Sequence, residues 1–202
     1  MTKLYLDSDI DEIIENMGTL SESFEGKHVL ITGAGGFLGR YFTAVFEKLN
    51  ESVLQHGCRV TALYNFISSN NPSYAELETS GVTYIKHDVI EPFESKEPFD
   101  YILHAAGIAS PYYYRAMPLE TIEVSVTGTK NMLQKAMKSN ANLLFFSSSE
   151  IYGDPDPKYI PTPESYRGNV SCLGARACYD ESKRLGETLC RVFHTHHGVH
   201  TN

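Results

Sequence analysis

Cysteine is scarce in this chain, and its positions argue against a metal or disulfide framework. The 202 residues contain four cysteines, none of them in a C-x-x-C pair: Cys58, Cys172, Cys178 and Cys190. Such spacing predicts neither a zinc knuckle nor a set of disulfides, so no metal site is expected. Reduced thiols are typical of the cytoplasm, where we expect this protein to act.

Basic residues are also in short supply. Lys and Arg number 17 against 25 Asp and Glu, which gives a formal net charge of −8. Nucleic-acid binding needs concentrated positive charge to neutralise phosphates, so a nucleic-acid partner is not expected. No apolar run approaches the roughly 18 residues that a membrane-spanning helix needs. The acidic N-terminus also lacks the basic-then-apolar order of a signal peptide.

The first 26 residues are predicted to form a helical arm. Within the segment 9–17, apolar residues recur at helical spacing, at Ile10, Ile13, Ile14 and Met17. They would share one face, which we expect to pack against another surface. The remainder, 27–202, is expected to form one domain, because 42% hydrophobic and 11% aromatic residues are enough for a core.

From residue 27 onward, strand-like apolar segments alternate with segments of helical periodicity. Strands are predicted at 28–32, 59–64, 82–89, 101–107 and 142–149. Helices are predicted at 37–49, 118–139 and 179–194, with an irregular Pro- and Gly-rich stretch at 153–174. This alternation predicts the α/β class, with a doubly wound parallel sheet of the Rossmann type. The last residues resemble the start of a sixth strand, so we expect a truncated chain whose C-terminal substrate subdomain is missing.

A glycine-rich turn lies between the first predicted strand and the first long helix. Its glycines follow a G-x-x-G-x-x-G pattern, at Gly33, Gly36 and Gly39. In dinucleotide-binding domains such glycines permit a tight turn, close approach of the backbone to a pyrophosphate, and close packing of helix on strand. The helix would begin at Phe37 and Leu38, and its N-terminal N–H groups favour a phosphate. This turn therefore predicts a cofactor site.

Other cofactor contacts are predicted where the following strands end. An acidic residue usually binds the adenosine ribose at the end of the second strand, but this chain has Tyr64 and then Asn65. No Lys or Arg lies between residues 60 and 85 to neutralise a 2′-phosphate, so NAD is favoured over NADP. Asp88, a candidate for the adenine amino group, could instead cap a turn. The other predicted contacts are Val89, Ala105 and Ala106.

Tyr179 and Lys183 are four residues apart on a predicted helix, so they lie one turn apart on the same face. An ammonium close to a phenol favours the phenolate, which makes Tyr179 a candidate general base. Ser148 follows the strand 142–149, at the strand end where open α/β sheets bind ligands. The three residues together predict removal of a hydroxyl proton beside a hydride acceptor.

These motifs, in this order, resemble the extended short-chain dehydrogenase/reductases of the NAD-dependent epimerase/dehydratase family. Several segments are similar to its UDP-glucuronate decarboxylases, namely SPYYY, SSSEIYGDP, YRGNV, GARACYDESKR and ETLC. The 4,6-dehydratases typically have Asp where this chain has Ser149, followed by Glu. The pair Ser149 and Glu150 therefore favours decarboxylation over loss of water.

The resemblance implies a role for each site residue. Tyr179 would take the proton of the sugar C4 hydroxyl, Lys183 would bind the nicotinamide ribose, and Ser148 would bind the C4 oxygen. Glu150 would act near C5, in ring distortion or protonation, as the 4-ketone loses carbon dioxide and UDP-xylose forms. Predicted contacts to the UDP-sugar are Tyr114, Ser149, Glu150 and Asn169. A homodimer that pairs the long helix and the Tyr179 helix is also implied.

Two residues depart from the family pattern, and several alternatives stay open. Ser125 stands where the family usually has Asn, and Tyr64 replaces the ribose-binding Asp, so the substrate could be a different sugar acid. A 4-epimerase, a 4,6-dehydratase or a non-catalytic NAD-binding module are the alternative functions. Glu150 could cap a turn, and Asn169 and Arg176 could organise the 153–174 loop. The 202 residues by themselves are expected to be weakly active or inactive.

Overall fold

The computed structural model of the chain describes residues 5–67 and 81–202. Within these residues a six-stranded parallel sheet has the order β3-β2-β1-β4-β5-β6, which confirms the doubly wound Rossmann-type prediction. The sheet includes the sixth strand whose start the last residues predicted. The strands are β1 (His28–Thr32), β2 (Arg59–Tyr64), β3 (Val82–Lys86), β4 (Tyr101–His104), β5 (Asn142–Phe145) and β6 (His200–Thr201).

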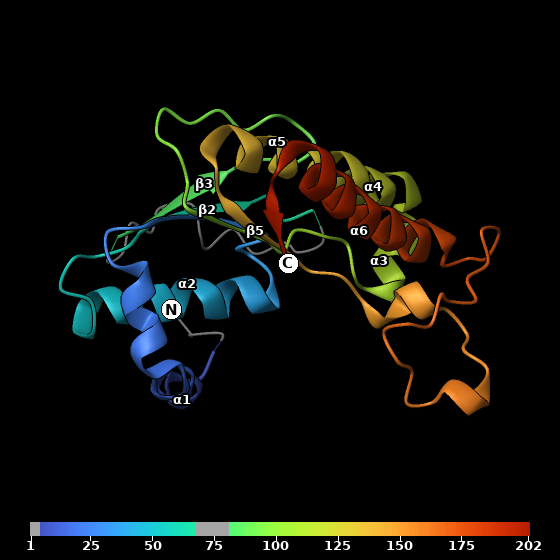
Figure 1. Cartoon of the computed structure of the whole chain (residues 1–202), viewed down its shortest axis with the longest axis horizontal. Coiled ribbons are helices and arrows are strands. Elements are labelled where there is room, and N and C mark those ends of the chain that lie inside the picture. Colours follow the sequence, from blue (N-terminus) through green and yellow to red (C-terminus); the bar gives the residue numbers. More distant parts are fainter. Residues whose placement is uncertain (1–4, 68–80) are drawn as a thin grey trace.

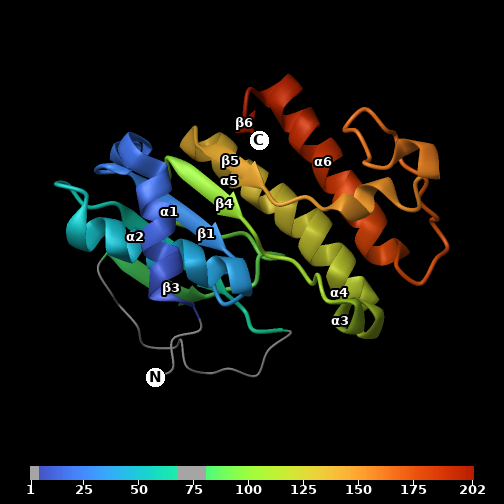
Figure 2. The same cartoon turned by 90° about the horizontal axis from the view of Figure 1, so that it is seen from below.

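Helices cover both faces of the sheet. The first face carries α1 (Asp7–Met17) and α2 (Phe37–Ser52), and the second carries α5 (Thr129–Ser139) and α6 (Ala177–His197) (Figures 1 and 2). Alternate residues of β1 serve the two cores, because successive strand side chains point to opposite faces. Val29 and Ile31 belong to the core under α2, and Leu30 belongs to the core under α5 and α6. Both faces are therefore buried, as parallel sheets require.

The predicted N-terminal helix is present and packs on the first face. It begins two residues earlier than predicted, at Asp7, and is followed by a 3₁₀ helix, η1 (Gly18–Phe24). Ile10 is buried, and Ile13, Ile14 and Met17 pack against the core that contains α2, as their spacing predicted. Residues 1–4 of the predicted arm lie outside the described residues.

The predicted helix 118–139 is interrupted. It consists of α4 (Pro118–Glu123), a π-helical turn η2 (Val124–Gly128) and α5. A π turn adds one residue to the helical repeat, and such turns occur mostly inside α-helices at functional sites. Gly128 in this turn lies close to the loop that follows β3, because a Cβ added to it would be 2.7 Å from a methyl group of Val89. A short helix that the sequence did not predict, α3 (Pro111–Ala116), precedes α4.

The strands that lead to the site are shorter than predicted. Strands β3, β4 and β5 end at Lys86, His104 and Phe145, so the residues that follow them form loops at one edge of the sheet. The stretch after β5 contains two short 3₁₀ helices, η3 (Ser149–Tyr152) and η4 (Pro157–Tyr159). The predicted site residues therefore lie on loops and helix ends at the carboxyl edge of the strands.

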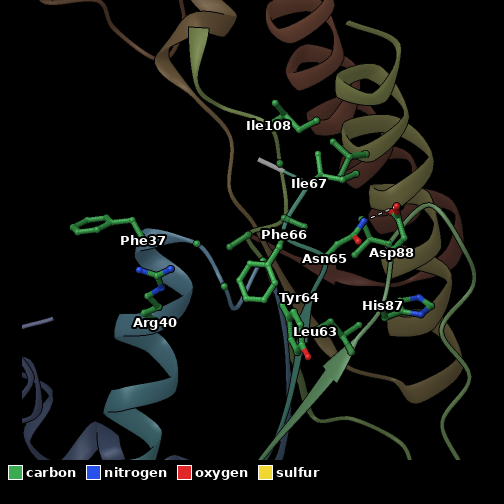
Figure 3. Close-up of a pocket in the computed structure, with 18 residues that line it drawn as sticks. Phe37, Arg40, Leu63, Tyr64, Asn65, Phe66, Ile67, His87, Asp88 and Ile108 are labelled. Carbon is green, nitrogen blue, oxygen red and sulfur yellow. Dashed lines mark hydrogen bonds between the residues drawn. The ribbon is translucent and has the colours of Figure 1, made fainter. Parts of the chain in front are cut away.

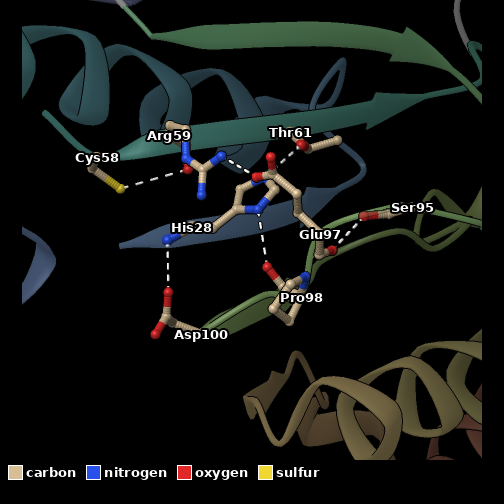
Figure 4. Close-up of polar contacts among 8 residues, drawn as sticks. All are labelled: His28, Cys58, Arg59, Thr61, Ser95, Glu97, Pro98 and Asp100. Atoms are coloured by element: carbon tan, nitrogen blue, oxygen red, sulfur yellow. Dashed lines mark hydrogen bonds and ion pairs between the residues drawn. The ribbon is translucent and has the colours of Figure 1, made fainter. Parts of the chain in front are cut away.

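The opposite edge of the sheet is held by a polar cluster around His28 (Figure 4). The imidazole Nδ1 lies 3.1 Å from the Pro98 carbonyl oxygen, and Nε2 lies 3.0 Å from the Thr61 hydroxyl oxygen. Asp100 accepts hydrogen bonds from the His28 backbone N–H at 2.8 Å and from Lys27 Nζ at 3.0 Å. These contacts tie the start of β1 to the loop that leads into β4.

Candidate active site

The glycine turn forms one wall of a cavity of about 320 Å³ (Figure 3). Gly33 has φ +71°, and a Cβ there would lie 2.8 Å from the backbone of Ala105 and Ala106. A Cβ on Gly39 would lie 2.2 Å from the Gly33 carbonyl oxygen, so helix and turn touch through backbone. Gly36 caps the N-terminus of α2, where Phe37 and Leu38 begin the helix. The turn thus has the open backbone and helix terminus that a pyrophosphate requires.

The residues that follow β2 and β3 line the same cavity. Asn65 Nδ2 donates to Asp88 Oδ2 at 2.7 Å, so the two predicted cofactor residues lie side by side. Asp88 Oδ1 also accepts from the Ile90 backbone N–H at 3.2 Å. The capping contact weighed for Asp88 is thus formed while its carboxylate still lines the cavity. Tyr64 is buried, with its ring 4.8 Å from that of Phe66.

Two residues that line the cavity were not predicted from the sequence. Arg40, one residue after the glycine turn, lines the cavity from α2, and Phe66 lies between Arg40 and Asn65 in the view of Figure 3. An added Cβ on Gly35 would meet the Phe66 ring at 2.5 Å, so this ring packs on the glycine turn. The prediction of NAD considered positive charge only between residues 60 and 85, whereas Arg40 lies on helix α2. Part of that range, 68–80, lies outside the described residues.

The segment after β4 forms the floor of the cavity. Ala105, Ala106 and Ile108 line it, together with Val89 from the β3 loop and Val124 from the π turn. The predicted cofactor residues of four separate segments therefore meet in one cavity, although more than 70 residues separate the first from the last. Such convergence at the carboxyl ends of parallel strands is where open α/β sheets bind ligands.

Tyr179 and Lys183 lie on α6, both about 6% exposed. The Lys183 Nζ atom is 6.0 Å from the centre of the Tyr179 ring and donates a 2.6 Å hydrogen bond to the Phe146 carbonyl oxygen. Burial lowers the pKa of Lys183 to about 8. The predicted one-turn relationship is confirmed, and in this structure the ammonium is anchored on the end of β5.

Tyr114 lies against Tyr179. The ring centroids are 5.3 Å apart, the planes differ by 14°, and Tyr114 is only 2% exposed. Tyr114 was predicted to contact substrate, and what the structure provides is a contact with the candidate base. Sequence spacing gives no indication of this stack, because 65 positions separate the two residues.

The serines after β5 and Glu150 form a short 3₁₀ turn. Ser148 is its N-cap, and its hydroxyl oxygen accepts the Glu150 backbone N–H at 3.3 Å. Ser149 is exposed at the start of the turn. The Glu150 carboxylate forms an ion pair with Arg176, whose Nε also lies 3.8 Å from Asp180. Arg176, the residue just before α6, therefore holds the Glu150 side chain in place.

Asn169 organises its loop. Its side chain donates to the Asp154 carbonyl oxygen at 3.0 Å, and its backbone pairs with Gly153 as an isolated β-bridge. This geometry corresponds to the structural alternative weighed for Asn169. Ser125 lies in the π turn, 1% exposed, and its hydroxyl has no hydrogen-bond partner among the described residues.

The sequence that forms this site matches the model of a known family. The sequence model of the NAD-dependent epimerase/dehydratase family matches residues 29–201. This chain belongs to the NAD-dependent epimerase/dehydratase family. Within the described residues, no helix is long and apolar enough to cross a membrane, and no group of three or more His, Cys, Asp or Glu could hold a metal ion.

Individual members of the epimerase/dehydratase family are similar over most of the chain. UDP-glucuronic acid decarboxylase 1 from Xenopus tropicalis is 38% identical over 181 residues, which cover 89% of this chain and 40% of that protein. UDP-glucuronic acid decarboxylase 5 from Arabidopsis thaliana is 39% identical over 171 residues, or 85% and 48% of the two chains. The chain thus spans less than half the length of these relatives.

A solved structure has the same fold. The dTDP-glucose 4,6-dehydratase from Streptomyces venezuelae, crystallised with NAD, superimposes with a TM-score of 0.68 at 21% identity. The match covers 86% of this chain and 53% of the dehydratase. At this identity the likeness concerns the fold alone.

Proposed function

We propose that this protein is an NAD-dependent nucleotide-sugar decarboxylase that converts UDP-glucuronate to UDP-xylose through a 4-keto intermediate. The observation that carries the proposal is the 38–39% identity to two UDP-glucuronic acid decarboxylases over 85–89% of the chain. The Ser149–Glu150 pair, at the position where the resemblance separates decarboxylases from dehydratases, supports the same assignment. The proposal concerns the activity of the whole protein, because the chain spans less than half the length of these relatives.

The described residues fit NAD. The glycine cradle leaves no room for a Cβ at Gly33 or Gly39, and the N-terminus of α2 faces the turn, as a pyrophosphate requires. Asn65 and Asp88 offer polar atoms to the adenosine end, and Ala105 and the residues after it form an apolar floor. When bound, NAD supplies the hydride acceptor and, at the end of the cycle, the hydride donor.

Proton removal is assigned to Tyr179. Its phenolate would take the proton of the sugar C4 hydroxyl, while Ser148 binds the C4 oxygen. Lys183 stabilises negative charge on the phenol, because its ammonium is buried within 6.0 Å of the ring centre, where water screens little. Its hydrogen bond to the Phe146 carbonyl orients the ammonium. These residues hold and move one proton at the C4 oxygen.

Decarboxylation needs little further chemistry. A 4-ketone lies β to the C5 carboxylate, so the C5–C6 bond breaks with its electrons stabilised as an enolate, and carbon dioxide leaves. The enolate then takes one proton at C5. We assign Glu150 to this region, where Arg176 orients its carboxylate.

Incubation of the protein, and of any form that extends beyond Asn202, with UDP-glucuronate and NAD tests the reaction. Chromatography of the nucleotide sugars should show a UDP-pentose, with release of carbon dioxide. A UDP-hexuronate epimer as the sole product would instead identify a 4-epimerase, and a 4-keto-6-deoxy product from a neutral nucleotide hexose would identify a 4,6-dehydratase. If neither a UDP-pentose nor carbon dioxide is formed, the proposal is refuted.

A non-catalytic NAD-binding module is the alternative from another class. The Tyr64 and Ser125 departures favour it, whereas retention of Ser148, Tyr179 and Lys183 argues against it, because binding alone needs none of them. A Tyr179→Phe variant separates the two. The decarboxylase assignment predicts intact NAD binding with turnover lower by several orders of magnitude, and equal turnover would refute the role of Tyr179.

We also propose that the protein is a cytoplasmic homodimer. Its four cysteines are all unpaired thiols, which supports a reducing compartment. Helices α4 and α6 lie side by side (Figures 1 and 2) and leave apolar side chains exposed, which supports a helical interface. These side chains are Leu119, Ile122, Leu185 and Val192. Light scattering should give twice the chain mass, and a Leu185→Glu variant should give the monomer.

A further inference from the structure

A chain of four hydrogen bonds runs through His104 on the face of the sheet that α5 and α6 cover. The Ala106 backbone N–H donates to Thr32 Oγ1 at 3.1 Å, and Thr32 Oγ1 lies 2.8 Å from His104 Nδ1. On the other side, His104 Nε2 lies 3.1 Å from Thr129 Oγ1, which donates to the Ser125 carbonyl oxygen at 2.6 Å. Each of these side chains is at most 1% exposed.

The direction of every bond in this chain follows from its two ends. A carbonyl oxygen only accepts, so the Thr129 hydroxyl hydrogen goes to Ser125 and the Thr129 oxygen must accept from His104. The imidazole therefore carries its hydrogen on Nε2. A neutral imidazole has one N–H, so Nδ1 accepts the Thr32 hydroxyl hydrogen, and the Thr32 oxygen accepts the Ala106 N–H. Each hydrogen then has one acceptor.

The surroundings keep His104 neutral. Burial, together with the smaller effect of the nearby positive charge of Lys183, lowers the pKa of His104 to about 3. A second imidazole hydrogen, on Nδ1, would face the Thr32 oxygen, whose own hydrogen would then lose its acceptor. The charge of Lys183 thus favours the neutral imidazole, and the direction of the chain selects its Nε2–H tautomer.

The chain connects two parts of the candidate site that are distant in sequence. At one end, Ala106 belongs to the cavity floor, and the next residue, Gly107, is close to Lys183, because an added Cβ there would lie 3.6 Å from Nζ. At the other end, the Ser125 carbonyl belongs to the π turn, whose Val124 also lines the cavity. His104 lies between them, on the face of the sheet that α5 covers.

We propose that His104 is a positioning residue, a fixed Nε2–H imidazole that holds the segment 105–108 and the π turn at a set separation and so shapes the cofactor cavity beside Lys183. The proposal rests on the proposed function only for the identity of the ligand, NAD. The tautomer and the mechanical coupling are properties of the chain itself and can be tested without ligand.

Nuclear magnetic resonance of the ¹⁵N-histidine-labelled chain tests the tautomer. Of the eight histidines, the expected result is one imidazole with a slowly exchanging proton on Nε2 and an acceptor-type Nδ1. Its Nε2–H resonance should shift in a Thr129→Val variant, which removes its acceptor. A protected proton on Nδ1 of the histidine that responds to Thr129→Val, or no histidine resonance that responds to this variant, would overturn the assignment.

Coupling along this hydrogen-bond chain is tested with matched threonine variants. Thr129→Val breaks the chain, and Thr129→Ser retains its hydroxyl. Thr121→Val is the control, because Thr121 is equally buried on α4 and its hydroxyl bonds the Met117 carbonyl at 2.7 Å, not an imidazole. Thr129→Val should speed hydrogen exchange of the Ala106 N–H and weaken NAD binding, measured by calorimetry, on the order of tenfold. Thr129→Ser should restore both.

Equal Ala106 exchange in the Thr129→Val and Thr121→Val variants would overturn the coupling. An equal loss of NAD affinity in the two variants would show that Thr129 contributes only to general stability. That result would refute the positioning role. If the wild-type chain binds no NAD while the exchange of Ala106 responds as expected, the proposed cofactor is wrong and the coupling stands.

Discussion

The ring of Tyr114 lies nearly parallel to the ring of Tyr179, with 5.3 Å between their centroids. Tyr114 comes from α3 and Tyr179 from α6, so the stack joins two helices beside the candidate site. A base acts efficiently only when its oxygen is held within a narrow range of positions. The stack restricts the Tyr179 ring to one plane, which gives Tyr114 a supporting role that its sequence position did not suggest.

The Tyr114 stack predicts a difference between two variants. Tyr114→Phe keeps the ring and should retain nearly full turnover. Tyr114→Leu keeps bulk but loses the planar surface, so turnover should fall by about 10- to 100-fold. Steady-state kinetics provide the measurement. A large rise in KM for Tyr114→Phe would contradict this account, because it would show that the hydroxyl binds substrate, as the sequence first suggested.

Lys183 is predicted to reduce the stability of the fold. Its folded-state pKa of about 8 is below the value of an exposed lysine, so burying the charge costs free energy below pH 8. Lys183→Met should raise the free energy of unfolding at pH 7 by about 1–2 kcal/mol, after loss of the bond to Phe146, while abolishing turnover. Urea denaturation provides the measurement.

The difference between Lys183→Met and the wild type should shrink as pH rises from about 8 towards 10.5. Over that range the unfolded chain binds more protons at Lys183 than the folded chain, so the wild type gains stability. A pH-independent difference would show that the effect arises from packing and not from charge.

Lowering the pH should destabilise the protein even before its carboxylates begin to take up protons. Burial lowers the pKa of His104 to about 3 and also lowers the pKa of His28, so in mildly acidic solution each binds more protons in the unfolded chain than in the folded one. Stability that is present above pH 6.5 should therefore be lost as pH falls from 6.5 to 4.5. His28→Gln should reduce this slope. Equal free energies of unfolding at pH 7.5 and 4.5 would contradict the prediction.

The Glu150–Arg176 ion pair should matter for activity and little for stability. The two side chains are 37% and 43% exposed, and ion pairs at such positions contribute about 0–1 kcal/mol. Arg176→Gln should therefore leave the melting temperature nearly unchanged and lower turnover, because Glu150 loses its orientation. Lys158→Gln, which breaks the exposed pair with Asp156, is the control. Equal turnover in both variants would show that Arg176 has no role.

Local patterns in the sequence were sufficient to predict the sheet, its parallel strands and the glycine turn. Each depends on residues close in sequence, such as the apolar run 28–32 followed by Gly33. The π turn was not predictable, because one inserted residue at 124–128 hardly changes the apolar periodicity of the long helix. Strand ends were overextended for a similar reason, since Phe146 continues the apolar run of β5, and Ala105 and Ala106 after β4 are themselves apolar.

Contacts between distant segments could not be predicted from one sequence. Arg40 reaches the cavity from a helix, Arg176 meets Glu150 across 26 positions, and Tyr114 meets Tyr179 across 65. No periodicity links such pairs, and only the fold brings them together. His104 illustrates the same limit, because the strand pattern of 101–107 gave no sign of its hydrogen bonds to Thr32 and Thr129.

The most direct test of the decarboxylase assignment follows a deuterium atom at C4 of the sugar. UDP-glucuronate labelled there is incubated with the protein and NAD, and the products are analysed by mass spectrometry. Oxidation at C4, loss of carbon dioxide and return of the same hydride predict a UDP-pentose that retains deuterium, with no pentose formed by Tyr179→Phe. Absence of a UDP-pentose, or equal formation by Tyr179→Phe, would contradict the assignment.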